Sequence, residues 1–105
     1  MSAEDSSGRP AKHRATVAGV EVDVTPTEHR LLEALRGQPG RAFTRAELVA
    51  LAMPGTVVLE RTIDVHVKGL RKKLGALAGV IEAVPRVGYR FVPPGQGPGA
   101  DDQGR

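Results

Sequence analysis

Apolar residues recur along residues 60–74 with the spacing of one helix face. Four aliphatic side chains follow the spacing i, i+4, i+7 and i+11, which places them on a single stripe of an amphipathic helix. These four are Ile63, Val67, Leu70 and Leu74. The opposite side of the segment carries mostly basic residues. The pattern therefore predicts a long helix over residues 60–74 that buries one face and presents positive charge on the other.

Two capping boxes predict two shorter helices before the long one. Thr25 and Glu28 stand three residues apart at the first, where Pro26 occupies the first helical position. Thr44 and Glu47 repeat the spacing at the second. In each box, the two side chains pair with backbone N–H groups that a helix start would otherwise leave unpaired. Gly and Pro residues further along are expected to end each helix.

Strand patterns flank these three helices. Residues 14–17 and 20–24 alternate in polarity around a short Ala-Gly turn, and residues 80–84 and 89–92 flank the turn 85–88. Both pairs predict antiparallel hairpins. The predicted fold is α+β: a three-helix core with a short N-terminal antiparallel strand pair and a C-terminal β-hairpin. Three helices followed by a hairpin are typical of a winged helix-turn-helix, in which the hairpin is the wing.

The two ends of the chain differ in composition from the segment between them. Residues 1–12 are polar without periodicity, and residues 93–105 are rich in Pro and Gly. Such segments cannot bury enough apolar surface to fold, so we expect both to be disordered. Residues 13–92 are then predicted to form one domain.

Composition excludes several classes of protein. The 105 residues contain no cysteine, which rules out disulfides and thiolate metal sites. The three histidines fall in separate predicted elements without metal-ligand spacing, so we expect neither a metal nor a cofactor. No apolar run approaches the roughly 20 residues of a membrane span, and no secretory signal is visible. We therefore expect a cytoplasmic protein without enzymatic activity or membrane contact.

Positive charge is concentrated in one part of the sequence. Residues 61–92 carry seven Lys or Arg against two acidic residues, a net charge of +5, whereas the whole chain carries +3. A patch of this kind indicates a polyanion binder. A basic helix fits the major groove of DNA, and an Arg on the neighbouring hairpin could reach the minor groove. For the basic run 71–73 alone, a solvated surface would be the better interpretation; its position beside Arg86 and Arg90 favours contact with DNA.

Four segments in order resemble the effector domain of OmpR/PhoB-type response regulators. They are Thr-Pro-Thr-Glu-His-Arg-Leu-Leu (25–32), Glu-Arg-Thr-Ile-Asp-Val-His-Val (60–67), Leu-Arg-Lys-Lys-Leu-Gly (70–75) and Val-Gly-Tyr-Arg-Phe (87–91). The resemblance implies a transcription regulator of two-component type that binds double-stranded DNA, usually as a head-to-tail homodimer. It also implies a receiver domain and a sensor kinase, neither of which is part of this chain. Whether the chain is a segment of a longer regulator or a single-domain protein stays open.

The resemblance also implies which residues meet DNA. It assigns phosphate contacts to Arg61, His66, Lys68, Arg71 and Tyr89. The candidates for base or groove contacts are Val65, Gly69, Lys72 and Arg86.

Departures from the family pattern affect mainly the contacts that read sequence. Gly69 stands where a long cation is frequent, Ala83 replaces a frequent Thr, and Pro85 displaces the usual wing Arg by one residue. Contacts that position the protein are thus kept, while those that specify bases are altered. We expect weak intrinsic specificity, and we expect Gly69→Arg to add affinity and to firm the helix.

Local roles are also predicted for two other residues of these motifs. Asp64 precedes Lys68 by one helical turn, so an i, i+4 ion pair would account for it. Gly88 is expected to supply a turn position with positive φ.

The apolar loop before the long helix has two interpretations. Val57, Val58 and Leu59 could cap the core between helices, or they could contact RNA polymerase, as the resemblance implies. A further alternative concerns the whole domain: a winged-helix protein–protein interaction module that has lost specific DNA readout. The salt dependence of DNA binding would separate that alternative from a DNA-binding regulator.

Overall fold

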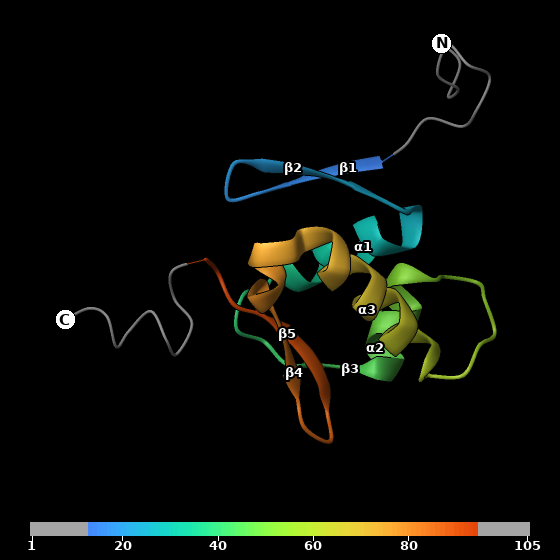
Figure 1. Ribbon diagram of the computed structural model, residues 1–105. Coiled ribbons are helices and arrows are strands. Elements are labelled where there is room, and N and C mark those ends of the chain that lie inside the picture. Colours follow the sequence, from blue (N-terminus) through green and yellow to red (C-terminus); the bar gives the residue numbers. More distant parts are fainter. Residues whose placement is uncertain (1–12, 95–105) are drawn as a thin grey trace, which may run out of the picture.

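Three α-helices and two small antiparallel sheets form the fold in the computed structural model, which describes residues 13–94 (Figure 1). The predicted lead 1–12 and residues 95–105 of the predicted tail lie outside the described residues. In chain order, the elements are β1 (His13–Val17), β2 (Val20–Val24), α1 (Pro26–Arg36), β3 (Phe43–Thr44), α2 (Arg45–Ala52), α3 (Thr62–Leu74), the 3₁₀ helix η1 (Gly75–Val80), β4 (Ile81–Val84) and β5 (Gly88–Phe91).

Both predicted capping boxes are present. At α1, Thr25 Oγ1 accepts the N–H of Glu28 at 3.1 Å and Glu28 Oε1 accepts the N–H of Thr25 at 2.9 Å. At α2, the corresponding bonds of Thr44 and Glu47 are 3.0 and 2.9 Å. Four N–H groups at the helix starts are therefore satisfied by side chains close in sequence. The long helix differs from expectation because α3 begins at Thr62 rather than residue 60 and has no side-chain cap.

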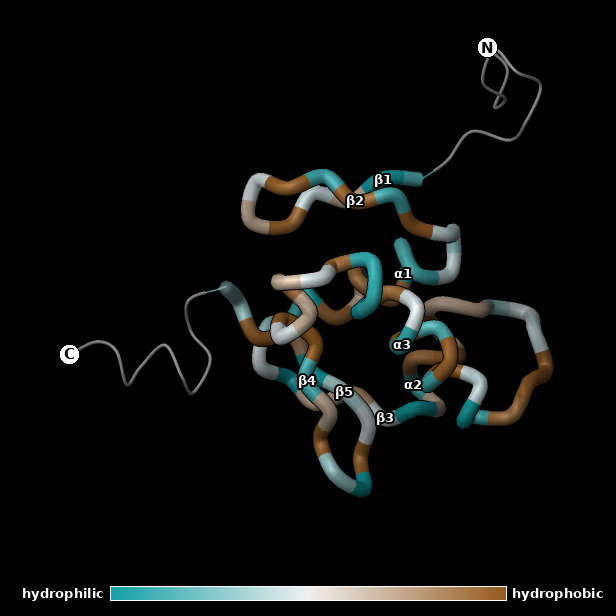
Figure 2. Tube along the Cα trace, viewed as in Figure 1, coloured by the Kyte–Doolittle hydropathy of each residue, from teal (hydrophilic) through white to brown (hydrophobic). Residues whose placement is uncertain are grey.

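The N-terminal hairpin lies along one side of the helices (Figure 1). Its register pairs His13 with Val24 and Val17 with Val20. The two turn residues, Ala18 and Gly19, both have positive φ, as a tight type I′ hairpin turn requires. Apolar and polar residues alternate along both strands (Figure 2), so each strand buries one face against the helices.

The wing belongs to a sheet of three strands, with the order β3-β5-β4. The hairpin β4–β5 is confirmed, whereas β3 is not in the predicted pattern. Phe43 pairs with Tyr89 and Thr44 with Gly88. A strand of two residues has no alternation that could reveal it, and Thr44 is also the N-cap of α2. Through β3, the wing is joined to the start of the second helix.

Aliphatic side chains fill the space between the helices and sheets. The residues with no exposed surface are Leu31, Leu32, Leu35, Leu48, Ala52, Ile63, Leu70 and Ile81. The four stripe residues of α3 are all buried, as predicted. No helix within residues 13–94 is long and apolar enough to cross a bilayer.

The role predicted for Gly88 is wrong. Positive φ in the wing turn falls on Arg86, at 67°, and not on Gly88. Gly88 is needed for a different reason: a Cβ at this position would lie 2.1 Å from the carbonyl oxygen of Phe43. The backbones of β3 and β5 are therefore too close here for any side chain.

Replacement of Gly88 tests this close approach. Gly88→Ala should lower the free energy of unfolding by about 2 kcal/mol, because a methyl group against a backbone carbonyl forces the strands apart. Urea titration provides the measurement. Gly79→Ala is the matched control: a Cβ there meets nothing within 4 Å, so its effect should stay within about 0.5 kcal/mol. Equal stability of the two variants would show that β3 and β5 can separate freely.

Candidate nucleic-acid interface

The outer side of α3 combines one exposed apolar side chain with several basic ones. Val65, the fourth residue of α3, is 68% exposed. The exposed cations of this surface, called the basic face below, are Arg61, Lys68, Arg71 and Lys72. The inner stripe that they oppose is buried. The amphipathic pattern therefore predicted the orientation of the helix correctly.

The cations near α3 differ in whether an acid holds them. Within the described residues, no carboxylate oxygen lies within 4.0 Å of a side-chain nitrogen of the basic face, so none of its four residues forms an ion pair there. Lys73, by contrast, places Nζ 2.6 Å from Glu28 Oε1. In the basic run 71–73, the first two cations are available to a polyanion, and the third joins α3 to α1.

Gly69 is half-buried and lies close to α1, which makes it a weaker candidate for a base contact than Val65 or Lys72. A Cβ built on Gly69 would stand 2.8 Å from Glu28 Oε2, and Glu28 is only 4% exposed. His66 and Lys73 are spaced i−3 and i+4 from Gly69, so all three share the flank of α3 that faces α1. His66 is half-buried there.

Asp64 joins three elements at a single oxygen atom. Its Oδ1 accepts Arg45 Nε at 2.8 Å and the Tyr89 hydroxyl at 2.6 Å. The expected pairing with Lys68 is therefore wrong. Arg45 begins α2, Asp64 lies in the first turn of α3, and Tyr89 belongs to β5. No pattern along the chain indicated this cluster, since the three residues share no local periodicity.

Ionisation in this cluster follows from burial and hydrogen bonding. Burial acts to raise the pKa of Asp64, but the bonds from Tyr89 and Arg45 outweigh it and leave that pKa below its usual value. Burial, together with the bond to Asp64, raises the pKa of Tyr89. The bond to Asp64 likewise raises the pKa of Arg45. Near neutral pH, Asp64 is thus charged and Tyr89 keeps its proton.

Tyr89 is poorly placed for its predicted phosphate contact. The residue is 7% exposed, and its single hydroxyl proton points to Asp64. Beside it, a hollow of about 200 Å³ opens between α3 and β5. The hollow is lined by Asp64, Val67, Lys68, Arg71 and Tyr89. Lys68 and Arg71 bring positive charge to this hollow.

The wing presents one available cation. Val87 donates its N–H to the carbonyl of Val84 at 3.0 Å, which closes a four-residue turn. Pro85 and Arg86 occupy the centre of this turn, and the positive φ of Arg86 is the pattern of a type II turn. Arg90, the other cation of the wing, pairs with Glu82 across the strands.

The apolar loop before α3 is exposed. Val57 is 101% exposed and Leu59 63%, whereas Val58 is half-buried. The interpretation that the loop caps the core is wrong for Val57 and Leu59, which leaves them open to a partner.

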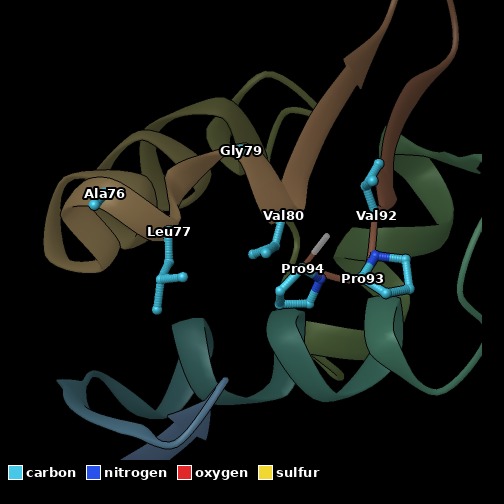
Figure 3. Close-up of a pocket in the computed structure, with 7 residues that line it drawn as sticks. All are labelled: Ala76, Leu77, Gly79, Val80, Val92, Pro93 and Pro94. Atoms are coloured by element: carbon cyan, nitrogen blue, oxygen red, sulfur yellow. The ribbon is translucent and has the colours of Figure 1, made fainter. Parts of the chain in front are cut away.

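Two further features of the described residues bear on other ligands. The rings of His13 on β1 and His29 on α1 have centroids 5.4 Å apart. No group of three or more His, Cys, Asp or Glu residues in the described part of the chain is arranged to hold a metal. An apolar hollow of about 250 Å³ lies between η1 and the end of the wing (Figure 3), and it carries no charged side chain. Its lining is Ala76, Leu77, Gly79, Val80, Val92, Pro93 and Pro94.

Comparison with known proteins identifies the family. Residues 19–91 match the family described as "Transcriptional regulatory protein, C terminal". The chain belongs to this family. The predicted OmpR/PhoB-type effector domain and its winged-helix fold are thereby confirmed.

Similar proteins are response regulators. The phosphate regulon transcriptional regulatory protein PhoB of Pseudomonas aeruginosa is 42% identical over 84 residues, which cover 78% of this chain and 37% of that protein. The transcriptional regulatory protein BaeR of Escherichia coli is 43% identical over 84 residues, covering 76% and 35%. This effector domain therefore spans little more than a third of the curated relatives.

Solved structures of similar domains include complexes. The DNA-binding domain of the response regulator AdeR, in complex with an intercistronic region, has a TM-score of 0.68 and 36% identity and covers 78% of this chain and 87% of that one. The Klebsiella pneumoniae RstA DNA-binding domain in complex with the RstA box has a TM-score of 0.64 and 26% identity, with 85% and 88% covered.

Replacement of Gly69 should change the stability of this effector domain in the direction opposite to the one that the sequence predicts. Gly69→Ala should destabilise the domain by about 1 kcal/mol, because Glu28 must move and leave its bonds to Thr25 and Lys73. Helix propensity alone would predict a gain of about 1 kcal/mol. Urea titration distinguishes the two signs.

A double-mutant cycle supplies the control. In a Glu28→Ala background the obstructing carboxylate is gone, so Gly69→Ala should there become neutral or stabilising. Destabilisation of equal size in both backgrounds would mean that Glu28 is not the obstacle.

Proposed function

We propose that this effector domain binds double-stranded DNA and regulates transcription as the output module of a two-component system. The observation that carries the proposal is the basic face of α3, where cations without acidic partners surround an exposed Val65. A surface of this kind, on a helix that protrudes beside a wing, suits the major groove. Further support comes from relatives that were solved on DNA.

Within this proposal, Arg61, Lys68 and Arg71 are the principal phosphate contacts. His66, half-buried on the flank toward α1, and Tyr89, bonded to Asp64, are weaker candidates. Val65 and Lys72 are the groups of α3 that would face base edges, and the methyl groups of Val65 suit the methyl group of thymine. Arg86 would extend from the wing to the minor groove.

Several partners follow from family membership and remain proposals for this chain. They are a receiver domain with its sensor kinase, a second copy bound head to tail on DNA, and RNA polymerase. The exposure of Val57 and Leu59 supports a polymerase contact, because it leaves two apolar side chains of one loop accessible to a partner. We place the domain in the cytoplasm and assign it no enzymatic activity.

Salt dependence tests the proposal against the protein-interaction alternative. The plot of log K against log salt concentration should have a slope of about −3 to −5 per protomer, one counterion for each phosphate that a cation neutralises. Arg71→Ala should reduce the slope by about 1 and weaken binding to every sequence alike.

Arg14→Ala is the matched control for this titration. Arg14 lies on β1 and pairs with Glu21 and Asp23, so its loss should leave the slope unchanged. No binding to any duplex at low salt, or a slope near zero, would support a protein-interaction module instead.

The wing is tested with three variants of Arg86. Arg86→Ala should weaken binding to A·T-rich flanks roughly fivefold, and binding to G·C-rich flanks less, because a narrow groove strengthens the attraction. Arg86→Lys should retain most of the affinity. Arg86→Gly should lose the same affinity as Arg86→Ala but stabilise the fold by about 1 kcal/mol, since glycine adopts φ of 67° without strain.

Fluorescence anisotropy on paired duplexes and urea titration provide the two measurements. Equal losses on both kinds of flank would make Arg86 a general phosphate contact rather than a groove contact.

A further inference from the structure

Tyr89 is bonded to the rest of the domain in a way that the proposed DNA contacts do not explain. Its hydroxyl donates to Asp64 Oδ1 at 2.6 Å, and Arg45 donates to the same oxygen at 2.8 Å. The Arg45 guanidinium also lies 5.5 Å from the centroid of the Tyr89 ring. All three side chains are thus in mutual contact, at a point where α2, α3 and β5 meet.

Tyr89 also lies in β5, the central strand of the wing sheet. It pairs with Phe43 of β3 on one side and with Ala83 of β4 on the other. Any tilt of Tyr89 relative to Asp64 therefore tilts the three-stranded sheet relative to α3. Arg86 precedes Tyr89 by three residues and lies in the turn that closes the hairpin, so at most about 10 Å of chain separates the two.

The position of Arg86 at the wing tip therefore depends on the hydrogen bond between Tyr89 and Asp64. Rotation of the hairpin by about 10° around Tyr89 would displace Arg86 by at most roughly 2 Å, whereas a binding group must be held to about 0.5 Å to keep its contact. A neutral hydroxyl bonded to a carboxylate is a short, directional interaction. The low pKa of Asp64 keeps this carboxylate ionised near neutral pH.

We propose that Tyr89 and Asp64 are positioning residues for DNA binding: their hydrogen bond, supported by Arg45, sets the angle between the wing and α3, so that both can reach DNA together. Tyr89 acts through Asp64 and not by donating to a phosphate, because one hydroxyl proton cannot serve both acceptors. This inference rests on the proposed DNA binding and assigns a role to residues behind the contact surface.

Tyr89→Phe removes only the hydroxyl and is the central variant. Its affinity is measured on two duplexes that share the segment under α3, one with the flank that the wing reaches and one cut short before it. Binding is recorded well below the unfolding temperature of each variant. We expect a loss of up to about fivefold on the long duplex, the size expected for Arg86→Ala, and less than twofold on the short one. Arg86→Ala should show the same contrast, and adding it to Tyr89→Phe should cost little more.

A second measurement uses Asp64→Ala. If Tyr89 acts through Asp64, then Tyr89→Phe has almost no effect on affinity in the Asp64→Ala background. A direct phosphate contact by Tyr89 would instead give the same loss in both backgrounds and on both duplexes, which would overturn the inference. A change in stability with unchanged affinity on the long duplex would also overturn it.

The outcomes separate this inference from the proposed function. Failure of the unmodified domain to bind the long duplex at low salt would overturn the proposed function. Binding by the unmodified domain, combined with equal losses on the two duplexes, would overturn the positioning role alone.

Discussion

Burial of the apolar stripe of α3 is the constraint on which the rest of this domain depends. Each of the four stripe residues contributes about 1.5–3 kcal/mol by leaving water, and together they press the helix onto α1, α2 and β2. With one face buried, the other must point outward. The cations of the basic face are exposed because they lie on the side of α3 opposite to the stripe. Packing of the core and formation of the charged surface therefore occur together.

Two polar contacts then refine the rotation of α3 about its axis. On one flank, Lys73 pairs with Glu28, which also caps α1 and packs against Gly69. On the other flank, Asp64 is held by Arg45 and Tyr89. Exposed ion pairs are worth little, but both of these acids are at least partly buried and hydrogen-bonded. The contacts decide which basic residues remain available to a partner and which serve the fold.

The tertiary structure changes the interpretation of the positions at which this chain departs from the motifs of the response-regulator family. At Gly69, a side chain would meet Glu28 of α1, so the glycine at this position has a reason within the fold. The groups that could read bases are Val65 and Lys72 on α3, with Arg86 on a turn whose φ favours glycine. A strained Arg at this place is consistent with a functional demand for its charge, since nothing in the turn itself requires it.

The sequence by itself determined the helices, the two hairpins, the orientation of α3 and the family. Caps, periodicity and turn residues act over a few neighbouring positions, so they can be read along the chain. The sequence could not reveal β3, the reason why residue 88 is a glycine, the flank of α3 on which Gly69 lies, or the bond between Tyr89 and Asp64. These depend on contacts between residues as far as 46 positions apart, as in the pairing of Phe43 with Tyr89. Only the packing of complete elements brings such residues together, and that packing decided which side chains support the wing and which are free to meet DNA.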